Sequence, residues 1–373
     1  MAFGKEDVLS VSGEYGVINQ IAFQGRSFAG ESVADYHVVE TDDIVYTKSP
    51  LKANPYGIIK VNKGIPGIVS TLYAVYHPLN TVAPRFVDLY FANNLRLNKF
   101  LKPLVNIGAK HDMKVNNSFV LTGTVVFPSI GEQQKFVDFF AKLDRRIVAQ
   151  RKIVEALKKY KRGVFEAIFT RKLRLVPKAR QSDWTAFELS DFATRITRKN
   201  NGATDIPLTI SAQYGLIDQR DFFSKVVASS DMSGYYLLRR GEYAYNRSTS
   251  NDYPFGSIKR LELYNEGAVS TLYLCFAIKE DVVLSNFAKW YFESSQWHRG
   301  VNEICAEGAR NHGLLNVPTD DFFDTVHILP SDIEEQAQIA AFLSRVHDKL
   351  AKAQEELDKL IGLRNGLMQQ LFI

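Results

Sequence analysis

The sequence predicts an α+β fold in which two pseudo-symmetric globular α/β domains are separated by two long antiparallel coiled-coil helices. Three observations lead to this prediction: the chain repeats itself, each repeat ends in a long heptad pattern, and turn signals divide the rest of each repeat into short strands and helices. The chain has 373 residues, of which 46% are hydrophobic and 23% charged, so two domains with cores of their own fit within it.

The repeat consists of short blocks that recur in the same order at an offset of 199 or 200 residues. Small changes of offset are what loop insertions produce, and the preserved order makes chance similarity a poor explanation. The paired blocks are Val8–Gln20 with Pro207–Gln219, Asp43–Pro50 with Glu242–Thr249, Pro55–Gly57 with Pro254–Gly256, Val69–Tyr73 with Val269–Tyr273, and Gly108–Lys110 with Gly308–Arg310.

The last pair of blocks predicts the long helices. Glu132–Phe169 and Glu335–Phe372 align without a gap at an offset of 203, and apolar residues recur in both at alternating spacings of three and four. That 3.5-residue period is the seam of a coiled coil. Because a long helix with one apolar stripe is unstable alone, we expect the two stripes to pack on each other in antiparallel orientation.

Both long helices carry a start signal. Ser129–Glu132 and Ser331–Glu334 fit the capping box, in which the serine accepts a backbone N–H and the glutamate returns the bond. Strands are predicted before them at Asp43–Thr47, Gly57–Val61, Val125–Phe127 and Ala268–Ala277, and short amphipathic helices at Pro84–Asn94 and Ser285–Ser294. The apolar side chains of these short helices are predicted to be core rather than base-stacking platforms: Phe86, Leu89, Tyr90, Phe287, Trp290 and Tyr291.

These patterns place the first domain at 1–131, the first spacer helix at 132–169, a basic linker at 170–183, the second domain at 184–334 and the second spacer helix at 335–373. The two domains differ at their starts. Trp184–Asp205 precedes the first repeated block of the second domain, whereas only Met1–Glu6 stands there in the first. We therefore expect the first domain to lack a strand or short helix, because its start is misassigned or because it is a truncated or silent cassette.

Composition narrows the class of protein. The net charge of +5 permits an anionic partner without requiring one. The two cysteines have no metal-ligand spacing, no apolar run approaches the roughly 20 residues that span a bilayer, and the first ten residues lack a signal-peptide pattern. We expect a cytoplasmic protein outside the membrane. The strongly basic stretch Lys158–Arg180 fits a solvated helix face and a phosphate-contacting surface equally well.

A duplicated unit that ends in P-S-x-x-E-Q and a long heptad helix closing on phenylalanine resembles the specificity subunits of Type I restriction-modification enzymes. The elements here are PSIGEQQ with Phe169 and PSDIEEQ with Phe372, and the similarity covers nearly the whole chain. The resemblance implies that each domain is a target-recognition domain for one half of a split, asymmetric site in double-stranded DNA, and that the helices set the distance between the halves.

The resemblance also implies partners. Two modification (methyltransferase) subunits would dock on this chain and hold S-adenosylmethionine, and restriction (motor-nuclease) subunits would complete the complex and use ATP and Mg. This chain would bind no cofactor itself and would catalyse nothing.

DNA is contacted by Arg, Lys, Asn and hydroxyl-bearing side chains that are presented mostly on loops. The predicted contacts are Lys48, Asn246 and Arg247 after matched strands; Lys110, His111, Arg310 and Asn311 after matched Gly-Ala turns; Tyr15 and Tyr214 before matched glycines; and Lys158, Lys159 and Arg162 on the first long helix. The alternatives are a surface salt bridge for Lys48 and Arg247, and packing for the tyrosines. Lys161, at a seam position, fits either phosphate contact or extension along apolar surface.

Catalytic signals are missing from the sequence. Asn54-Pro55-Tyr56 is similar to the Asn-Pro-Pro-Tyr type of motif in adenine methyltransferases, but it lacks the second proline and no glycine-rich cofactor loop accompanies it, so we interpret it as a turn at a strand edge. The seven histidines form no metal-binding pattern. Two other functions remain alternatives: a self-sufficient DNA adenine methyltransferase and a coiled-coil scaffold that does not bind DNA.

Overall fold

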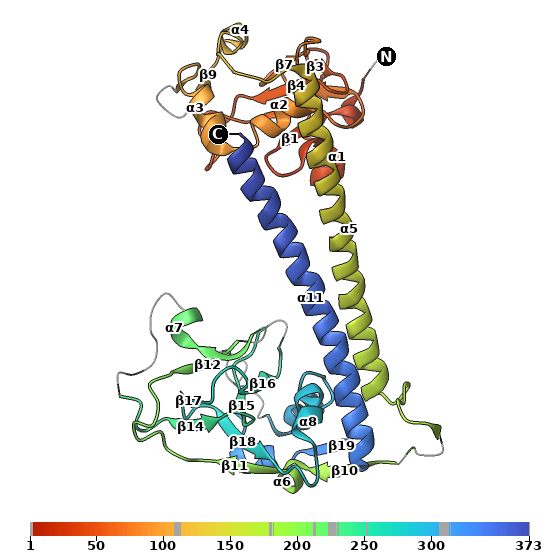
Figure 1. Ribbon diagram of the computed structural model, residues 1–373, viewed down its shortest axis with the longest axis vertical. Coiled ribbons are helices and arrows are strands. Elements are labelled where there is room, and N and C mark those ends of the chain that lie inside the picture. Colours follow the sequence, from red (N-terminus) through yellow and green to blue (C-terminus); the bar gives the residue numbers. More distant parts are fainter. Residues whose placement is uncertain are drawn as a thin grey trace. The chain divides into compact units, whose positions relative to one another are not determined.

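The computed structural model describes residues 3–107, 113–178, 181, 183–211, 214–222, 229, 231–250, 253–305, 313 and 315–372. The chain divides into two compact units: unit 1 comprises Met1–Lys152 and Gln354–Ile373, and unit 2 comprises Ile153–Ala353. Two long helices, α5 (Ile130–Phe169) and α11 (Ile333–Leu371), contribute to both units. Each unit therefore contains its own globular part and a stretch of each long helix (Figure 1).

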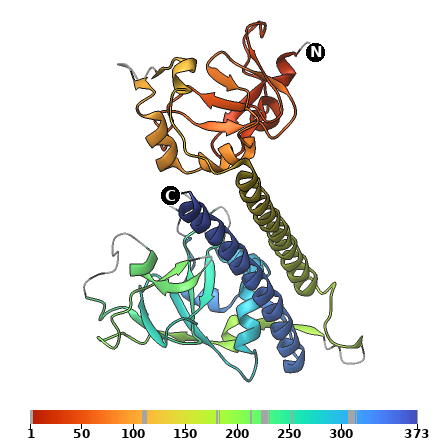
Figure 2. The ribbon, with the colours of Figure 1, turned by 45° about the horizontal axis from the view of Figure 1, so that its top comes forward.

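The globular part of unit 1 is built from short antiparallel strands (Figure 2, red to orange). Among its described residues, the largest sheet has the strand order β5-β4-β7, and β1-β2, β3-β6 and β8-β9 form two-stranded ladders. The strands are β1 (Leu9–Ser12), β2 (Gly16–Asn19), β3 (His37–Val39), β4 (Ile44–Thr47), β5 (Ile59–Val61), β6 (Gly67–Val69), β7 (Tyr73–Tyr76), β8 (Asn106–Ile107) and β9 (Met113–Lys114). The short helices are η1 (Lys5–Asp7), α1 (Gln20–Gln24), α2 (Pro84–Tyr90), α3 (Asn94–Leu101) and α4 (Asn117–Val120).

Unit 2 has the same kind of globular part with a larger sheet. Its main sheet has the order β11-β18-β15-β16, and β10-β19, β12-β13 and β14-β17 form two-stranded ladders within the described residues. The strands are β10 (Trp184–Glu188), β11 (Ala193–Ile196), β12 (Leu208–Ser211), β13 (Gly215–Asp218), β14 (Tyr236–Arg239), β15 (Tyr243–Asn246), β16 (Ser257–Arg260), β17 (Glu266–Val269), β18 (Leu274–Ile278) and β19 (Val326–Pro330). The short helices are α6 (Leu189–Phe192), α7 (Gln219–Phe222), α8 (Ser285–Phe292), α9 (His298–Ile304) and α10 (Thr319–Phe323).

The two globular parts share one pattern of core contacts. Strand β4 pairs with β5 and β7 as β15 pairs with β16 and β18. Tyr46 and Tyr245, at the same position of the central strand, are fully buried. Each donates its hydroxyl to the backbone carbonyl ten residues later, Tyr56 at 2.7 Å and Phe255 at 2.9 Å. These bonds fix the repeated Pro-aromatic-Gly turn against the sheet, because a buried hydroxyl needs a partner.

The glycine of that turn is required in both units. Gly57 has φ of 89° and Gly256 has φ of 77°, both in the left-handed region that favours glycine. A Cβ atom would stand 2.0 Å from the carbonyl oxygen of Thr47 in one unit and 2.1 Å from that of Asn246 in the other. The repeated glycine therefore reflects backbone geometry and close packing.

A glutamine at the start of each long helix fastens the helix to its globular part. In unit 1, Gln133 accepts the backbone N–H of Ala83 at 2.8 Å and donates to two further backbone carbonyls. In unit 2, Gln336 accepts the backbone N–H of Leu284 at 2.8 Å and donates to the two corresponding carbonyls. Both glutamines are buried. The repeated Glu-Gln of the sequence thus joins each long helix to α2 or α8.

The long helices run antiparallel within each unit, as the heptads predict. In unit 1, Arg364 on α11 pairs with Asp144 on α5 at 2.5 Å. In unit 2, the ammonium of Lys161 on α5 lies 3.3 Å from Nδ1 of His347 on α11. The offset of 203 makes Arg364 the counterpart of Lys161 and Asp144 the counterpart of His347, so the same positions meet in both units. Among the described helices, none combines the length and apolar content that a bilayer span requires.

The two long helices are capped differently. At α5, Glu132 accepts the hydroxyl of Ser129 at 2.7 Å and its backbone N–H at 3.1 Å, so the serine hydroxyl donates instead of accepting as predicted. These bonds hold the pKa of the Glu132 carboxyl below its usual value. At α11 the predicted serine cap is wrong: the carboxylate of Asp332 accepts a backbone N–H of the first turn. A carboxylate is favoured there by the helix dipole, and the Ser331 hydroxyl donates to the carbonyl of Asp183.

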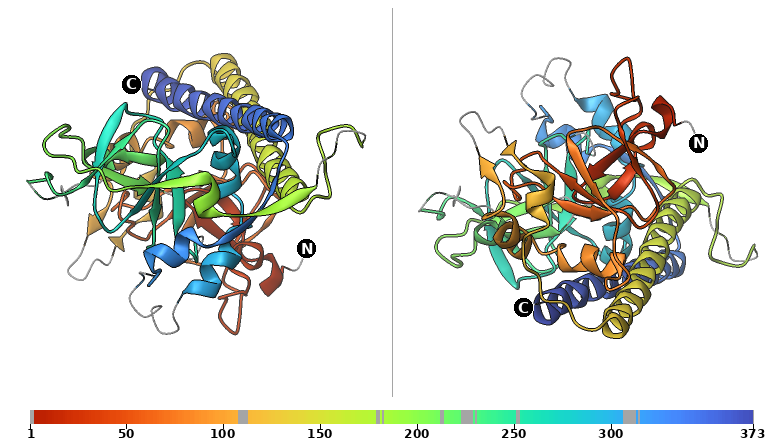
Figure 3. Two further views of the ribbon diagram at one scale, coloured as in Figure 1. Left: turned by 90° about the horizontal axis from the view of Figure 1, so that it is seen from below. Right: turned by 90° about the horizontal axis from the view of Figure 1, so that it is seen from above.

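One predicted strand is wrong. Strands β4 and β5 confirm two of the others, and Ala268–Ala277 forms two strands of different sheets, β17 and β18, where one was predicted, but Val125–Phe127 forms no strand. Its counterpart in unit 2 is β19, which is a strand because β10 pairs with it along its whole length (Figure 3, left panel). The described part of unit 1 holds no counterpart of β10. A strand needs a partner for its backbone groups, so the same local sequence pattern gives a strand in one unit only.

The predicted core role of the α2 and α8 side chains is confirmed. Tyr90 is half-buried, and the rest are buried: Phe86, Leu89, Phe287, Trp290 and Tyr291.

Candidate nucleic-acid interface

Each unit has a concave surface beside its long-helix segments, at positions that correspond through the duplication. Groove 1, in unit 1, has a volume of about 310 Å³, and groove 2, in unit 2, about 330 Å³. Groove 1 is formed by the tip of the β1-β2 hairpin, β5, α2 and one residue from each long helix. Groove 2 is formed by the β12-β13 hairpin tip, β15, β16, α8 and, again, one residue from each long helix.

An exposed tyrosine stands at each hairpin tip. Tyr15 is 60% exposed and Tyr214 is 61% exposed. Each precedes a glycine with positive φ, Gly16 at 74° and Gly215 at 81°, which makes the tight turn. Because both rings line a groove and keep most of their surface open, they are not core residues, and base stacking stays a prediction for them.

An ion pair on the wall of both grooves has its charges exchanged between the units. In groove 1, Lys63 lies 2.5 Å from Asp88 on α2, and in groove 2, Glu262 lies 2.8 Å from Lys289 on α8. Burial tends to raise the pKa of Glu262, but hydrogen bonds from Lys289 and Arg260 outweigh it and hold that pKa below its usual value. Both pairs are attractive, but the cation lies on the strand side in groove 1 and on the helix side in groove 2.

Groove 2 carries an excess of positive charge, and groove 1 does not. Four cations and two carboxylates line groove 2, whereas three of each line groove 1. The groove 2 residues are Lys161, Lys259, Arg260 and Lys289 with Glu262 and Glu293; those of groove 1 are Lys60, Lys63 and Arg364 with Glu14, Asp88 and Asp144. An anionic ligand such as a phosphate is therefore favoured more strongly in groove 2.

Lys161 lies at the helix side of groove 2. Its ammonium is 3.3 Å from Nδ1 of His347 and 5.7 Å from the ring centroid of Trp290, which agrees with extension along apolar surface, one of the two alternatives; phosphate contact stays a prediction. Burial lowers the pKa of Lys161; Glu293 acts in the opposite direction, and two neighbouring lysines act in the same direction. Burial and then Lys161 itself lower the pKa of His347. An anion in the groove would raise both pKa values, because it would stabilise the protonated forms.

The basic face of α5 borders a second concave surface of unit 2, with a volume of about 630 Å³. Lys158 and Arg162 line it together with Lys161, which it shares with groove 2. Lys159 is exposed on the same helix, and Lys158 lies 3.0 Å from Glu155, which neutralises part of its charge. The position of Lys158, Lys159 and Arg162 on this helix is compatible with phosphate contact, which stays a prediction.

The predicted contacts at the ends of β4 and β15 bond to backbone groups of their own units and do not line the grooves. Lys48 donates to the backbone carbonyl of Thr71 at 3.1 Å, and Arg247 donates to that of Leu272 at 3.0 Å and to a second carbonyl. Asn246 accepts a backbone N–H two residues on. Lys48 and Arg247 thus brace the repeated VSTLY turn, a role that the sequence did not suggest. Their contact with DNA stays a prediction. The other predicted contacts lie outside the described residues: Lys110, His111, Arg310 and Asn311.

Sequence reasoning missed most of the charged residues of the grooves. Lys60 and Lys259 fall at an offset of 199, as do Lys63 and Glu262. The ion pairs of groove 1 and groove 2 stand between the repeated blocks, where similarity is low. The sequence did contain a signal for these ion pairs, namely residues of opposite charge at aligned positions of the two repeats. When both members of an ion pair reverse their charge, the attraction between them is preserved.

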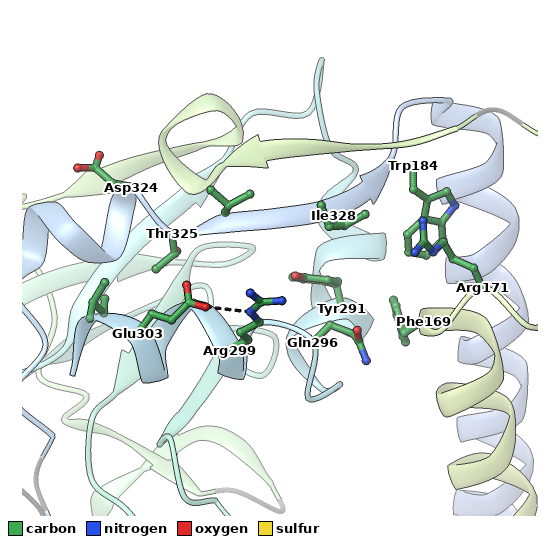
Figure 4. A pocket seen from close by; sticks show the side chains of 13 residues that line it. Phe169, Arg171, Trp184, Tyr291, Gln296, Arg299, Glu303, Asp324, Thr325 and Ile328 are labelled. Carbon is green, nitrogen blue, oxygen red and sulfur yellow. Dashed lines mark hydrogen bonds and ion pairs between the residues drawn. The ribbon is translucent and has the colours of Figure 1, made fainter. Parts of the chain in front are cut away.

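A further pocket of about 480 Å³ lies at the C-terminal end of α5 in unit 2 (Figure 4). Phe169, Arg171 and Trp184 line one side of it, and Arg299 on the other side is held by Glu303 at 2.9 Å.

Among the residues that the structure describes, no group of three or more His, Cys, Asp or Glu could hold a metal ion. The turn at Asn54-Pro55-Tyr56 is closed by backbone bonds, which agrees with its interpretation as a turn.

These features define a class of protein: a tandem duplication in which each unit joins a charged groove to part of an antiparallel helix pair. No family model and no curated protein matches the chain. The S subunit of the Type I restriction-modification system of M. genitalium is similar in structure, with a TM-score of 0.53 and 12% identity over 99% of this chain and 89% of that one. The HsdS subunit of Thermoanaerobacter tengcongensis matches with a TM-score of 0.47 and 14% identity over 90% of this chain and 81% of that one. The chain has the fold of the M. genitalium S subunit.

Proposed function

We propose that this chain is the non-catalytic specificity subunit of a Type I restriction-modification complex and recognises a bipartite, asymmetric sequence in double-stranded DNA. The observation that carries the proposal is the pair of grooves. They share the hairpin tip, the strand β5 or β16, the helix α2 or α8 and one residue from each long helix, yet their charges differ. Two grooves with the same backbone framework but different side chains suit two half-sites of different sequence. Phosphate contacts position a protein on DNA, and the side chains that differ select the bases.

The fold supports the same proposal. In each unit the long-helix segments adjoin the groove and contribute two of its residues, Asp144 and Arg364 or Lys161 and His347. A stiff helical segment attached to a reading surface suits a spacer between half-sites, since one turn of B-DNA is about 34 Å long. The remaining surface of these helices would dock two methyltransferase subunits, which would bring S-adenosylmethionine, and through them the motor-nuclease subunits.

Methylome sequencing tests the proposal. The chain is expressed with modification subunits of a Type I system in a host that lacks its own adenine methylation. We expect methylated adenine in one bipartite motif with two unlike halves and a fixed gap. An omission of this chain from the same strain is the control and should abolish the motif. A methylated motif without a gap, or methylation that persists in the control, would contradict the proposal.

Purified chain separates this function from its alternatives. A self-sufficient methyltransferase would bind S-adenosylmethionine and methylate DNA alone, whereas the specificity subunit would do neither. A scaffold that does not bind DNA would show no affinity for duplexes. Phosphate contacts predict a slope of log K against log salt of about −0.9 for each phosphate neutralised.

A further inference from the structure

The contact between the long helices carries different charges in the two units. In unit 1, Arg364 on α11 binds the carboxylate of Asp144 on α5 at 2.5 Å, so a cation and an anion meet there. In unit 2 the duplication places Lys161 and His347 at the same two positions, with the ammonium 3.3 Å from Nδ1. Unit 2 thus keeps the cation and has, in place of the anion, a side chain that is either neutral or positive.

Lys161 is the cation of groove 2 that has no carboxylate partner among the described residues. The other three cations each have a carboxylate within 2.8 Å: Lys259 with Glu293, Lys289 with Glu262, and Arg260 with Glu262. The indole of Trp290 lies 5.3 Å from the imidazole of His347, centroid to centroid, and donates to Ser344 on α11 at 3.1 Å. Helix α8 therefore holds the lysine and the histidine together beside the groove.

The hydrogen bond between Lys161 and His347 depends on the protonation state of the histidine. An ammonium group only donates, so Nδ1 accepts its N–H only while the imidazole is neutral. A protonated imidazole would place two positive charges 3.3 Å apart, which is unfavourable unless an anion lies beside them. Burial and then Lys161 accordingly lower the pKa of His347. Without a ligand, the groove favours the neutral ring.

The other charged groups around His347 do not supply that anion. After burial and the lysine on α5, Lys289 of α8 also lowers the pKa of His347, whereas Asp348 and Glu293 act in the opposite direction. Asp348 is the next residue on α11 and faces another side of the helix, and Glu293 is bound to Lys259. His347 is exposed, so an anion from solution can reach it. The remaining titratable groups of the groove are Tyr214, Tyr243, Tyr253, Arg260 and Glu262.

We propose that Lys161 and His347 form a site for one phosphate group of the DNA backbone, and that this phosphate binds together with a proton on the imidazole. The site rests on the function proposed above. The phosphate takes the role that the carboxylate of Asp144 has in unit 1, and its oxygens accept N–H groups of the ammonium and of the imidazolium. The proton comes from solvent. Phosphate and proton strengthen the binding of each other by the same factor.

The ring resonances of His347 test the site directly. The full chain is labelled on its histidine rings, and His347→Gln assigns the signal by its loss. A duplex of about 20 base pairs with random sequence is the probe, because phosphate contacts need no particular bases. We expect the duplex to raise the pKa of His347, since a phosphate stabilises the imidazolium.

Duplex affinity should depend on pH in the matching way. Between pH 7.5 and 6.0 we expect the affinity of the wild-type chain to rise about threefold more than that of His347→Gln, because only the wild type takes up the proton. His347→Asp reproduces the charges of unit 1, so it should bind the duplex more weakly and lose this additional rise. His298→Gln removes a half-buried histidine of unit 2 that does not line groove 2, and it should retain the rise.

The outcomes separate this site from the proposed function. A duplex that binds without raising the pKa of His347, or an equal pH dependence in the wild type and in His347→Gln, would overturn the site and leave the specificity function intact. If no duplex binds, the specificity function fails. Sodium sulfate, compared with sodium chloride at equal ionic strength, then decides the site alone. A raised pKa of His347 in sulfate would support an oxyanion site, and an unchanged one would overturn it.

Discussion

Unit 1 and unit 2 descend from one sequence pattern, and the contacts that they share differ in kind from those that they do not. The shared contacts join a side chain to the backbone: the buried tyrosine of the central strand to a carbonyl, and the helix glutamine to an N–H and two carbonyls. The contacts that differ join side chains to each other in the grooves, as in Lys63 with Asp88 and Glu262 with Lys289.

The difference teaches which parts of the duplicated unit are free to change. Mutation cannot remove a backbone N–H or carbonyl group. The side chain that forms a hydrogen bond with such a group is therefore retained wherever the fold is retained. A pair of side chains can change together without moving the backbone. The groove is therefore the part of each unit where new charge patterns arise at little structural cost.

The largest expected effect is a difference in stability between mutations at the starts of the two long helices. In unit 2, Glu335 is fully buried and Arg174 binds it through two bonds of 2.7 and 2.8 Å. Arg174→Met should lower the free energy of unfolding of unit 2 by about 3–5 kcal/mol, because it leaves a buried carboxylate without its main cation. The aligned Glu132 in unit 1 is exposed, so Glu132→Gln should change stability little. Denaturant melts followed by hydrogen exchange measure both, and equal effects in the two units would contradict this account.

Acid should destabilise unit 2 more than unit 1. Burial lowers the pKa of His327 to about 4, and its counterpart in unit 1 is Val125, which does not titrate. Below about pH 6.5 the unfolded chain binds a proton that the native histidine does not, so stability falls as the pH drops from 6.5 towards 4, by about 3 kcal/mol in total.

His327→Val is the control for that pH dependence. It removes bonds of 2.9 Å to Tyr291 and Thr325 and should lower stability at pH 7, but it should flatten the dependence between pH 6.5 and 4. Thermal melts across this range measure the slope. A slope that persists in the variant would assign the titration to another group.

DNA binding should depend more on groove 2 than on groove 1. Lys161→Gln should weaken binding to duplex DNA about tenfold at 100 mM salt and reduce the salt slope by about one. The matched variant is Arg364→Gln, whose cation is already paired with Asp144, and we expect it to weaken binding less than about threefold. Fluorescence anisotropy at several salt concentrations distinguishes the two. A greater loss for Arg364→Gln would reverse the assignment of the grooves.

The smallest expected effect tests the exchanged ion pair. Asp88→Lys alone places two cations together and removes the carboxylate that accepts the backbone N–H of Val61, so it should destabilise unit 1. Lys63→Glu with Asp88→Lys reproduces the charge arrangement of unit 2 and should recover the part of the loss that comes from repulsion. The coupling should be about 1 kcal/mol, because Lys63 is 53% exposed and solvent screens the pair. A double-mutant cycle measures it, and additive effects would mean that the two side chains do not interact.

Much of the fold could be predicted from the sequence because its signals are periodic. The heptads of Glu132–Phe169 and Glu335–Phe372 predicted two long helices that pack in antiparallel orientation, and this is confirmed within each unit. The apolar side chains of α2 and α8 were placed in the core correctly for the same reason. Of the residues that line the grooves, Tyr15 and Tyr214 were predicted to contact DNA because repeated blocks marked them, and that contact stays a prediction.

The sequence alone determined the duplication, the long helices and their pairing, since repeats and a 3.5-residue period survive without knowledge of any contact. Only the tertiary structure decided which charges line the grooves, that Lys48 and Arg247 brace a turn, and that Val125–Phe127 is not a strand. These outcomes depend on which backbone carbonyl or neighbouring strand lies within reach of a given residue. That distance is set by parts of the chain remote in sequence, which no local pattern encodes.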